Sequence, residues 1–316
     1  MIASKDIKNF PIFSLFNKAE LEEIVQLTTV TSLDRGQELF KKGAKRESFY
    51  IILEGEIAIV RHFGHTSQIV EIATAGEYIA EYALFDPRQT HDHTALSHTT
   101  HSSILELKGE QFKKLALETR YKLLLNLLPI ISDNFSHASN RLMALFYLGQ
   151  TLGTLMQNTR LMGTHILKIV LDAIRAKKAF IAMNEPDSAK IHIIATFNFG
   201  PKNDIAGKTF LIENEPILYP IIKNKKHLVL SAKDYLMSNK KVPYITSSVI
   251  GLPLPIGEDI IGAIVLIDKI EGNGFSANNE VLLNIIAHMV ALGLHHAKER
   301  EIQLAEQELK HKYISL

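Results

Sequence analysis

The segment between residues 91 and 101 holds the densest group of side chains that could do chemistry. It contains four histidines, His91, His93, His98 and His101, with Asp92 among them and Glu81 ten residues earlier. Imidazole and carboxylate groups bind Zn²⁺ or Ni²⁺, and His91 and His93 would share one face of an extended chain. The spacing matches no known ligand signature. We therefore expect surface histidines here and no metal site.

Side chains that could act in catalysis lack the partners that catalysis needs. Five hydroxyl groups fall between residues 97 and 103 without an accompanying base or oxyanion element. No Gly-rich loop leads into a helix in the way that a phosphate-binding loop does. We therefore expect the protein not to be an enzyme.

Short apolar runs separated by glycines surround these residues and must position them. Glycines interrupt such runs at Gly36, Gly43, Gly55, Gly64 and Gly76. This pattern is typical of short antiparallel strands joined by turns, and it predicts a compact antiparallel β-roll from about Val30 to Leu107. Asn17 is placed to cap a helix before the roll, and a further short helix is predicted over 111–117.

The pattern resembles the cyclic nucleotide-binding domain family over residues 1–120. The segments that carry the resemblance are Arg35-Gly-Gln-Glu-Leu-Phe, Phe49 to Val60, and Gly76-Glu-Tyr-Ile-Ala-Glu-Tyr-Ala-Leu. The last of these opens the family's ligand cassette, here residues 76–95. In that family a Glu accepts from the ribose hydroxyl, while backbone N–H groups and an Arg bind the cyclic phosphate. The resemblance implies cyclic AMP or cyclic GMP as the ligand.

The cassette follows the family's pattern at some positions and departs from it at others. The resemblance implies pocket residues Gly76, Ala80, Glu81, Tyr82, Ala83, Arg88, His93, Thr94 and Ala95. Glu81 stands at the ribose position, but Ala80 replaces the usual Gly. Where the family has Arg, Ser or Thr, and Ala, this chain has His93-Thr94-Ala95, preceded by Asp92. A carboxylate repels phosphate and a neutral imidazole carries no charge, so we expect Arg88, the only nearby arginine in the sequence, to supply the positive charge.

A second set of elements predicts another domain over 164–298, or from about 148 if its first helix begins there. Helices are predicted over 164–174, 216–223 and from Asn278 for about 25 residues, and strands over 179–183, 190–197 and 227–230. Two apolar runs flank the turn Gly257-Glu-Asp and predict a hairpin. Together the elements predict an antiparallel sheet with helices. The whole chain is then α+β, with two domains joined by a long helix.

This second unit resembles the GAF domain family, a sensory α/β fold. The resemblance rests on Val249-Ile-Gly-Leu-Pro-Leu, on the hairpin, and on Asp268-Lys269 followed by Phe275 and Asn279-Glu280. Nucleotide-binding members carry Asn-Lys and Asp-Glu at the two ends of that motif. The resemblance implies a pocket between the sheet and the loops of 200–245, with Lys269 as its candidate residue. Because Asn279 replaces the Asp of the family's ion pair, we expect no cyclic GMP binding there.

The segment 121–163 connects the two predicted domains and carries a seven-residue repeat. Ala138, Leu145 and Leu152 occupy one position, and Leu148, Leu155 and Met162 the other. Three heptads are enough for a seam between two helices, so we expect a homodimer, helped by the helical tail 299–316. The alternative is that the stripe packs on its own domain. Pro129 predicts a kink or break in the helix.

Composition limits the remaining classes. The chain has 316 residues, a net charge of +1 and no cysteine. A net charge near zero argues against a general role on nucleic acid or on a membrane surface. The N-terminus lacks the apolar core of a signal peptide, and no run approaches the length of about 20 apolar residues that a membrane span needs. We expect a cytoplasmic protein with no nucleic acid and no membrane as partner.

Two functional hypotheses remain. The first is a non-enzymatic signalling protein that senses a small, cyclic nucleotide-like ligand and passes the signal to a protein partner by helix rearrangement. The alternative is a scaffold or adaptor protein whose degenerate pockets hold no ligand and which acts through dimerisation and partner docking.

Overall fold

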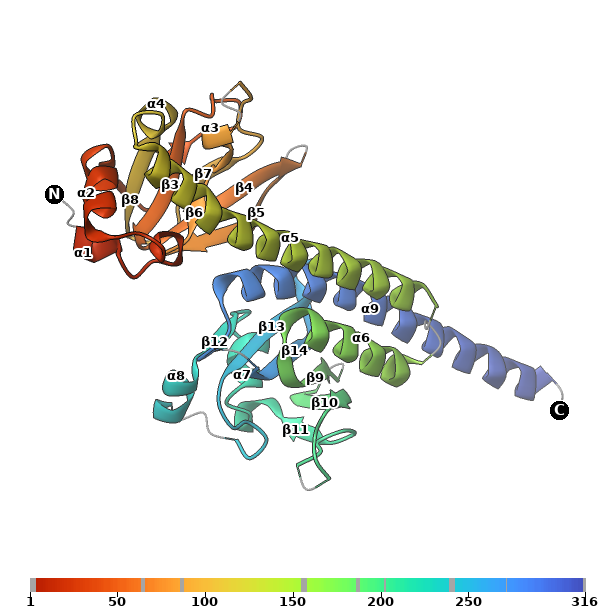
Figure 1. The fold of residues 1–316 in the computed structure, drawn as a ribbon. Coiled ribbons are helices and arrows are strands. Elements are labelled where there is room, and N and C mark those ends of the chain that lie inside the picture. The colour runs from red at the N-terminus through yellow and green to blue at the C-terminus, as the bar shows by residue number, and fades with distance from the viewer. Residues whose placement is uncertain are drawn as a thin grey trace. The chain divides into compact units, whose positions relative to one another are not determined.

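The chain forms two compact units in the computed structural model, Met1–His137 and Ala138–Leu316 (Figure 1). The structure describes residues 4–63, 66–85, 88–154, 158–185, 188–201, 203–238, 242–270 and 272–314. The division between the units falls inside helix α5 (Leu117–Thr154). This helix continues through Pro129, so the predicted break there is wrong.

The N-terminal unit begins with short helices that cover one end of the roll. These are α1 (Ser4–Ile7), the 3-10 helix η1 (Pro11–Phe13) and α2 (Lys18–Gln26). The predicted cap of α2 is confirmed, because Asn17 Oδ1 accepts from the Glu20 N–H at 3.0 Å and Glu20 Oε2 accepts from the Asn17 N–H at 2.8 Å. This reciprocal pair is a capping box, which fixes where the helix starts.

The predicted antiparallel roll is confirmed and consists of two four-stranded sheets. One sheet has the order β1-β8-β3-β6 and the other β2-β7-β4-β5. The strands are β1 Thr29–Asp34, β2 Glu38–Phe40, β3 Ser48–Glu54, β4 Glu56–Phe63, β5 Thr66–Thr74, β6 Tyr78–Ile79, β7 Thr94–Ser97 and β8 His101–Lys108. Helix α3 (Tyr82–Phe85) lies within the cassette. Helix α4 spans Gly109–Phe112, two residues earlier than the predicted start, and α5 begins at Leu117.

Gly55 shows why a glycine is needed between β3 and β4. Its φ is +80°, and a Cβ placed there would lie 2.4 Å from the His101 carbonyl oxygen and 2.6 Å from Thr99 Oγ1. An L side chain would therefore meet both strain and a backbone clash. This close approach holds β3 and β4 against the β7–β8 turn.

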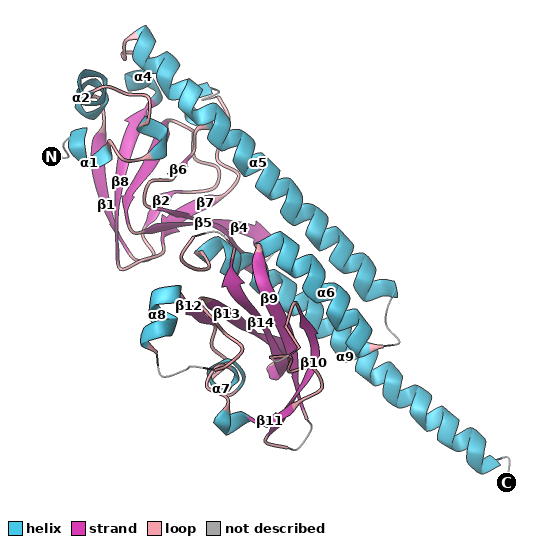
Figure 2. Cartoon of the chain, turned by 60° about the horizontal axis from the view of Figure 1, so that its bottom comes forward, coloured by secondary structure: helices cyan, strands magenta, loops and turns pink. Residues whose placement is uncertain are grey.

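The C-terminal unit is built on a six-stranded antiparallel sheet with the order β11-β10-β9-β14-β13-β12. Its strands are β9 Ala176–Asn184, β10 Lys190–Phe197, β11 Thr209–Leu211, β12 Leu228–Leu230, β13 Val249–Ile256 and β14 Asp259–Lys269. Its helices are α6 Thr159–Ile174, η2 Ile212–Asn214, α7 Leu218–Ile222, α8 Ala232–Met237 and α9 Ala277–Ile314. Figure 2 shows α6 and α9 on one face of the sheet, with α7 and α8 on the other side. The predicted hairpin is confirmed as β13 and β14.

Each face of this sheet has its own apolar core, because side chains alternate along the strands. On β9, Ile181 packs with α6 and α9, whereas Phe180 packs with the residues of 205–245. On β14, Leu266 and Val265 divide between the two cores in the same way. We call the second side the loop-covered face.

The leucines expected to form a dimer seam instead pack within the C-terminal unit. Leu148 is fully buried in the core with α6 and α9, and Leu145 and Leu152 pack against that core. Leu152 lies so close to Gly293 that a Cβ on that glycine would come within 2.3 Å of Leu152 Cδ2. Leu155 lies outside the described residues. The seam through these leucines is therefore wrong, and the packing alternative holds for the three described residues.

Helix α9 is the longest of the C-terminal unit and continues through the predicted tail as far as Ile314. Within the described residues, the part Ala277–Gln307 is long and apolar enough to cross a membrane by length and composition alone. Half of its most apolar window is buried inside the unit. The core helix of a soluble protein passes the same test, so this is weak evidence for a span.

Candidate functional site

A group of charged side chains gathers around Asp92 at the end of the cassette. Asp92 Oδ2 lies 3.0 Å from Arg61 Nη2, and Asp92 Oδ1 lies 3.9 Å from Arg46 Nη2. His93 Nδ1 lies 2.6 Å from Asp92 Oδ1. We call these four residues the Asp92 cluster. Three basic side chains surround one carboxylate in this cluster. An anion-binding site has the same composition, and here the carboxylate of Asp92 is the anion.

The backbone elements bring these residues together from three parts of the sequence. Arg46 lies in the loop before β3, next to the isolated bridge between Lys45 and Thr90. Arg61 lies on β4, one residue beyond Val60, which pairs with Thr94 of β7. Continuing that antiparallel register brings Arg61 opposite the residues just before β7. The sheet, rather than the local sequence, therefore makes the cluster.

Arg46 is held in place independently of Asp92. Its Nη1 donates to Gln89 Oε1 at 3.3 Å, and its guanidinium carbon lies 5.0 Å from the centre of the Tyr82 ring. Only 12% of its side chain is exposed. A guanidinium stacked on an aromatic ring and bonded on one edge keeps its remaining N–H groups in a fixed direction.

Glu81, the predicted ribose acceptor, lies in the same region, directly before α3. Burial raises the pKa of its carboxyl, and the charge of Glu71 adds to this rise, while Arg46 and His93 act in the opposite direction. Arg46 of the Asp92 cluster contacts the ring of Tyr82, so Glu81 directly precedes a residue that touches this cluster.

Tyr78, on β6, contributes a polar atom with no assigned use. Its hydroxyl is buried and has no hydrogen-bond partner among the described residues. Burial raises its pKa, and the charges of Glu81 and Glu71 raise it further, so this hydroxyl stays protonated. A buried hydroxyl without a partner is costly, and a ligand or a water molecule beside Glu81 would satisfy it.

Ala80 and Ala83 show how the cassette backbone is used. Ala80 has a φ of +61°, the left-handed region that the family's usual Gly adopts without strain. Ala80 O accepts from the Ala83 N–H at 3.0 Å. The Ala83 N–H, expected to bind phosphate, is therefore engaged in a turn. Gly76 also has a positive φ, +90°, and Phe10 packs on it.

His91 is not the surface histidine that the sequence predicts. It is only 3% exposed and stacks on Phe40 with ring centroids 3.7 Å apart. Burial lowers the pKa of His91 to about 4, and the nearby charges of His93 and Arg46 act in the same direction. His91 is therefore neutral at pH 7 and belongs to the packing of the roll.

Of the remaining predicted cassette residues, Thr94 and Ala95 are buried and Arg88 is exposed. Thr94 is buried, and its Oγ1 accepts from the Lys42 N–H at 3.1 Å. Ala95 is fully buried in the core of the roll. Arg88 is exposed, directly after residues 86–87, which lie outside the described part. Arg88 is not the only arginine near the site, because Arg46 and Arg61 lie against Asp92.

In the C-terminal unit, the predicted pocket residue Lys269 is used in a structural contact. Its Nζ donates to the carbonyl oxygen of Ile174, at the end of α6. Its neighbour Asp268 accepts from the Ser247 N–H at 2.8 Å and from the Thr246 hydroxyl. Burial acts to raise the pKa of Asp268, but these hydrogen bonds and Lys178 outweigh it and hold that pKa below its usual value. Asp268 thus fixes the segment before β13.

Apolar side chains occupy the loop-covered face, where a second pocket was expected. Phe180 of the sheet meets Tyr244 edge to face at 5.7 Å between ring centroids, and Phe199 packs beside both. The buried Glu215 carboxylate accepts from the Tyr244 hydroxyl at 2.8 Å. Burial raises the pKa of Glu215, and this hydrogen bond opposes the rise. The polar groups here satisfy each other.

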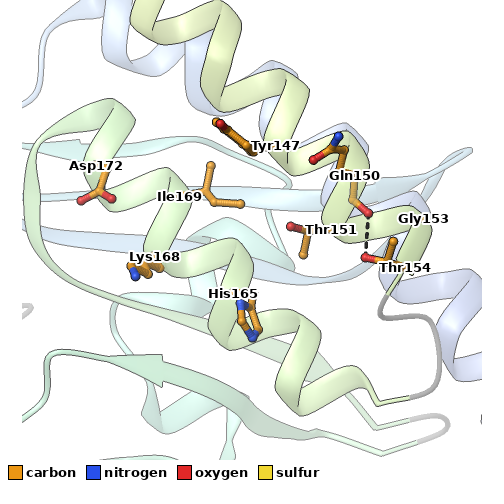
Figure 3. Close-up of a pocket in the computed structure, with 9 residues that line it drawn as sticks. All are labelled: Tyr147, Gln150, Thr151, Gly153, Thr154, His165, Lys168, Ile169 and Asp172. Carbon is orange, nitrogen blue, oxygen red and sulfur yellow. Dashed lines mark hydrogen bonds between the residues drawn. The ribbon is translucent and has the colours of Figure 1, made fainter.

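An open groove of about 890 Å³ lies between α5 and α6 in the C-terminal unit, and the sequence analysis did not anticipate it. Figure 3 shows Tyr147, Gln150, Thr151 and Thr154 along α5, facing His165, Lys168, Ile169 and Asp172 along α6. Thr154 Oγ1 donates to the Gln150 carbonyl oxygen at 2.9 Å. No ion pair joins the described residues that line this groove, whereas ion pairs hold the Asp92 cluster together.

Comparison with known proteins identifies the N-terminal unit. Residues 30–119 match the family described as cyclic nucleotide-binding domain, which confirms the predicted resemblance there. No curated protein matches. The GAF resemblance of the C-terminal unit stays a prediction.

Solved structures with similar folds cover about half of the chain. A cyclic nucleotide-binding domain from Methylobacillus flagellatus KT is 17% identical and covers 44% of this chain and 82% of its own, with a TM-score of 0.41. The catabolite activator protein of Thermus thermophilus is 16% identical, with coverages of 52% and 79% and a TM-score of 0.40. The sensor domain of the transcriptional regulator DNR from Pseudomonas aeruginosa is 21% identical and covers 42% of this chain and 91% of its own, with a TM-score of 0.36. None of these findings supports our expectation that nucleic acid is not a partner.

Proposed function

We propose that the protein is a non-enzymatic regulatory protein whose N-terminal unit binds a small anionic ligand of the cyclic nucleotide class. The family match of residues 30–119 gives the class of domain. The observations that carry the proposal are the convergence of Arg46, Arg61 and His93 on Asp92 within the cassette and the contact of Arg46 with the ring of Tyr82, the residue after Glu81. A carboxylate for a sugar hydroxyl, next to guanidinium groups for a phosphate, is the pair of functions that a cyclic nucleotide requires.

The roles of individual residues follow from their chemistry. Glu81 accepts from the ribose hydroxyl, and the hydroxyl of Tyr78 gains a partner when the ligand enters. Arg46 and Arg61 bind the cyclic phosphate, because guanidinium groups remain charged and offer parallel N–H donors. His93 adds a third donor.

Calorimetric titration of the full chain with cyclic AMP, cyclic GMP and a cyclic dinucleotide tests this proposal. We expect at least one cyclic nucleotide to bind, and Glu81→Ala and Arg46→Ala each to weaken it by about tenfold or more, since each removes a charge-assisted hydrogen bond. The matched controls are Glu110→Ala and Lys113→Ala, in and after α4. The absence of binding at millimolar concentration would overturn the proposal and favour the scaffold hypothesis.

Ligand binding can be passed on through a second copy of the chain, and we propose a homodimer formed through α5. The buried leucines are not available, but exposed apolar side chains recur at seven-residue spacing: Tyr121 (61% exposed), Leu128 (60%), Phe135 (75%) and Leu142 (69%). Such spacing on two copies of one helix forms a self-complementary seam. A ligand that alters the start of α5 would then alter the seam.

Light scattering of the full chain tests the dimer. We expect about twice the chain mass of 35.5 kDa. Phe135→Glu combined with Leu142→Glu should give the monomer, because two carboxylates would be buried in the seam. A monomeric wild type at tens of micromolar, or a double variant that remains dimeric, would contradict this surface.

A further inference from the structure

The contacts of Asp92 suggest an additional role for this residue, which rests on the proposed function. Asp92 is the nearest anion to Arg61, Arg46 and His93 in the described contacts, at 3.0, 3.9 and 2.6 Å. A cyclic phosphate carries one negative charge and accepts hydrogen bonds through its oxygens, as a carboxylate does. Asp92 therefore presents to these three side chains the same chemistry as the phosphate.

We propose that Asp92 is a tethered anion that occupies the phosphate position of the cassette, so that a phosphodiester ligand binds only by displacing its carboxylate. The domain then holds its basic residues together without a ligand. It responds only to ligand concentrations high enough to compete with an anion attached to the same chain, whose effective concentration is high.

Displacement is possible because Asp92 can move while its neighbours stay. Its side chain is 54% exposed, whereas Arg46 is 12% exposed and His93 is 21% exposed. The backbone on its N-terminal side is fixed, since the His91 N–H donates to the Ala44 carbonyl oxygen at 2.8 Å. Thr94, on its other side, is held by Lys42. Rotation of one side chain towards solvent would open the basic site without unfolding the loop.

The arrangement of Arg46 supports a site that persists when Asp92 leaves. Gln89 and the ring of Tyr82 hold the guanidinium from two other directions. Arg61 projects from β4, whose backbone is paired on both sides by β5 and β7. The loss of the Asp92 carboxylate would thus leave the Arg46 guanidinium in place, with Arg61 carried by a paired strand and His93 beside them.

The test compares the wild type with Asp92→Asn and Asp92→Ser in the full chain. Cyclic AMP and cyclic GMP are titrated by calorimetry, and inorganic phosphate is titrated by the rise in melting temperature. The proposal predicts that both variants bind the cyclic nucleotide at least about tenfold more tightly than the wild type, because a competing charge-assisted contact is gone. Glu110→Gln is the matched control, since it removes one exposed carboxylate of the same unit outside the Asp92 cluster.

A further variant shows whether the gain passes through the basic residues. In an Arg46→Ala background, Asp92→Asn should no longer increase affinity, so Arg46→Ala and the double variant should bind the cyclic nucleotide equally. If Arg46→Ala leaves the increase intact, general relief of repulsion explains the gain and the tethered anion is overturned.

The outcomes separate this proposal from the proposed function. Equal binding by the wild type and both Asp92 variants would overturn the tethered anion and leave cyclic nucleotide binding in place. A third outcome is that neither the wild type nor the variants bind a cyclic nucleotide, but phosphate raises the melting temperature of the variants in a way that depends on Arg46. This outcome would overturn the proposed ligand class and support the tethered anion. If no protein binds either cyclic nucleotides or phosphate, both the proposed function and the tethered anion are overturned.

Discussion

The cassette of the N-terminal unit and the loop-covered face of the C-terminal unit were both predicted as ligand pockets, and they are built in opposite ways. In the cassette, charged side chains converge and the Tyr78 hydroxyl is buried without a partner among the described residues. On the loop-covered face, aromatic and aliphatic side chains meet, and Glu215 and Tyr244 satisfy each other. A binding site offers polar groups that lack an internal hydrogen-bond partner, whereas the polar groups of a core bond to each other.

Two glutamates, the half-buried Glu81 and the buried Glu215, show the same difference. Burial raises the pKa of both Glu81 and Glu215. Around Glu81 the opposing influences are first a backbone hydrogen bond and then the basic side chains Arg46 and His93. Around Glu215 the opposing influence is one internal hydrogen bond. Charged side chains from other segments thus act on Glu81, whereas Glu215 is paired with one tyrosine.

The largest expected effect is on the free energy of unfolding, when a large side chain is removed from the loop-covered face. Phe180 is fully buried there, so Phe180→Ala should lower the free energy of unfolding of the C-terminal unit by about 3–5 kcal/mol. Urea unfolding followed by circular dichroism measures it. Leu236→Ala on the exposed surface of α8 is the control and should change stability by less than about 0.5 kcal/mol. A small loss at Phe180 would mean that this face is a pocket after all.

A smaller effect is expected when the internal hydrogen bond of that face is removed. Tyr244→Phe leaves the Glu215 carboxylate buried without its donor and should cost about 1–3 kcal/mol. Glu215→Leu combined with Tyr244→Phe removes both polar groups and should recover most of that loss. Urea unfolding of the two variants checks the order. If the double variant is the less stable one, the pair does not behave as a closed internal contact.

Acid stability should report on His91 in the cassette. The unfolded chain takes up a proton near pH 6.5, but the folded unit resists it until about pH 4. Stability from this residue is therefore present above pH 6.5 and is lost as the pH falls from 6.5 to 4. Glu81, with its raised pKa, acts in the opposite direction: its contribution is present below its unfolded pKa and is lost as the pH rises through its folded pKa.

The measurement is the melting temperature of the N-terminal transition at pH 7.5 and pH 5. His91→Phe keeps the stacking on Phe40 and should reduce the difference between the two pH values. His101→Gln, on the exposed end of β8, should leave the wild-type difference unchanged. An unaltered difference in His91→Phe would show that another group controls acid stability.

The smallest effect is expected at Ala80. Its φ of +61° strains an L residue, so Ala80→Gly should relieve that strain, offset in part by the greater freedom of glycine in the unfolded chain. We expect a net gain of up to about 1 kcal/mol. Ala95→Gly in the buried strand β7 should lose stability instead. A loss at Ala80 would show that its Cβ makes packing contacts that outweigh the strain.

The sequence predicted the features that depend on neighbouring residues. The cap at Asn17, the strands of the roll and the hairpin of β13 and β14 are local patterns of hydrogen-bonding and apolar residues. The prediction that Glu81 is a pocket residue also came from its place in the cassette, and it stays a prediction. These features need no knowledge of how distant segments pair.

The features that the sequence missed depend on pairing and packing between distant segments. Arg46 and Arg61 reach Asp92 through the Lys45–Thr90 bridge and the β4–β7 register, which no local pattern specifies. His91 is buried because Phe40 of β2 covers it. The seven-residue repeat of α5 is real in the sequence, but it cannot show which face the C-terminal core covers. Leu148 lies on the covered face and Leu142 on the exposed one.

The central claim is that the ligand site lies in the cassette and not on the loop-covered face. Hydrogen exchange of the full chain with and without millimolar cyclic AMP or cyclic GMP tests it most directly, because protection rises where a ligand orders the backbone. The account predicts slower exchange in residues 76–85 and 88–95 and around Arg46, with unchanged exchange over 205–238 and 242–245. Slower exchange over 205–238 and 242–245, with the cassette unchanged, would contradict it.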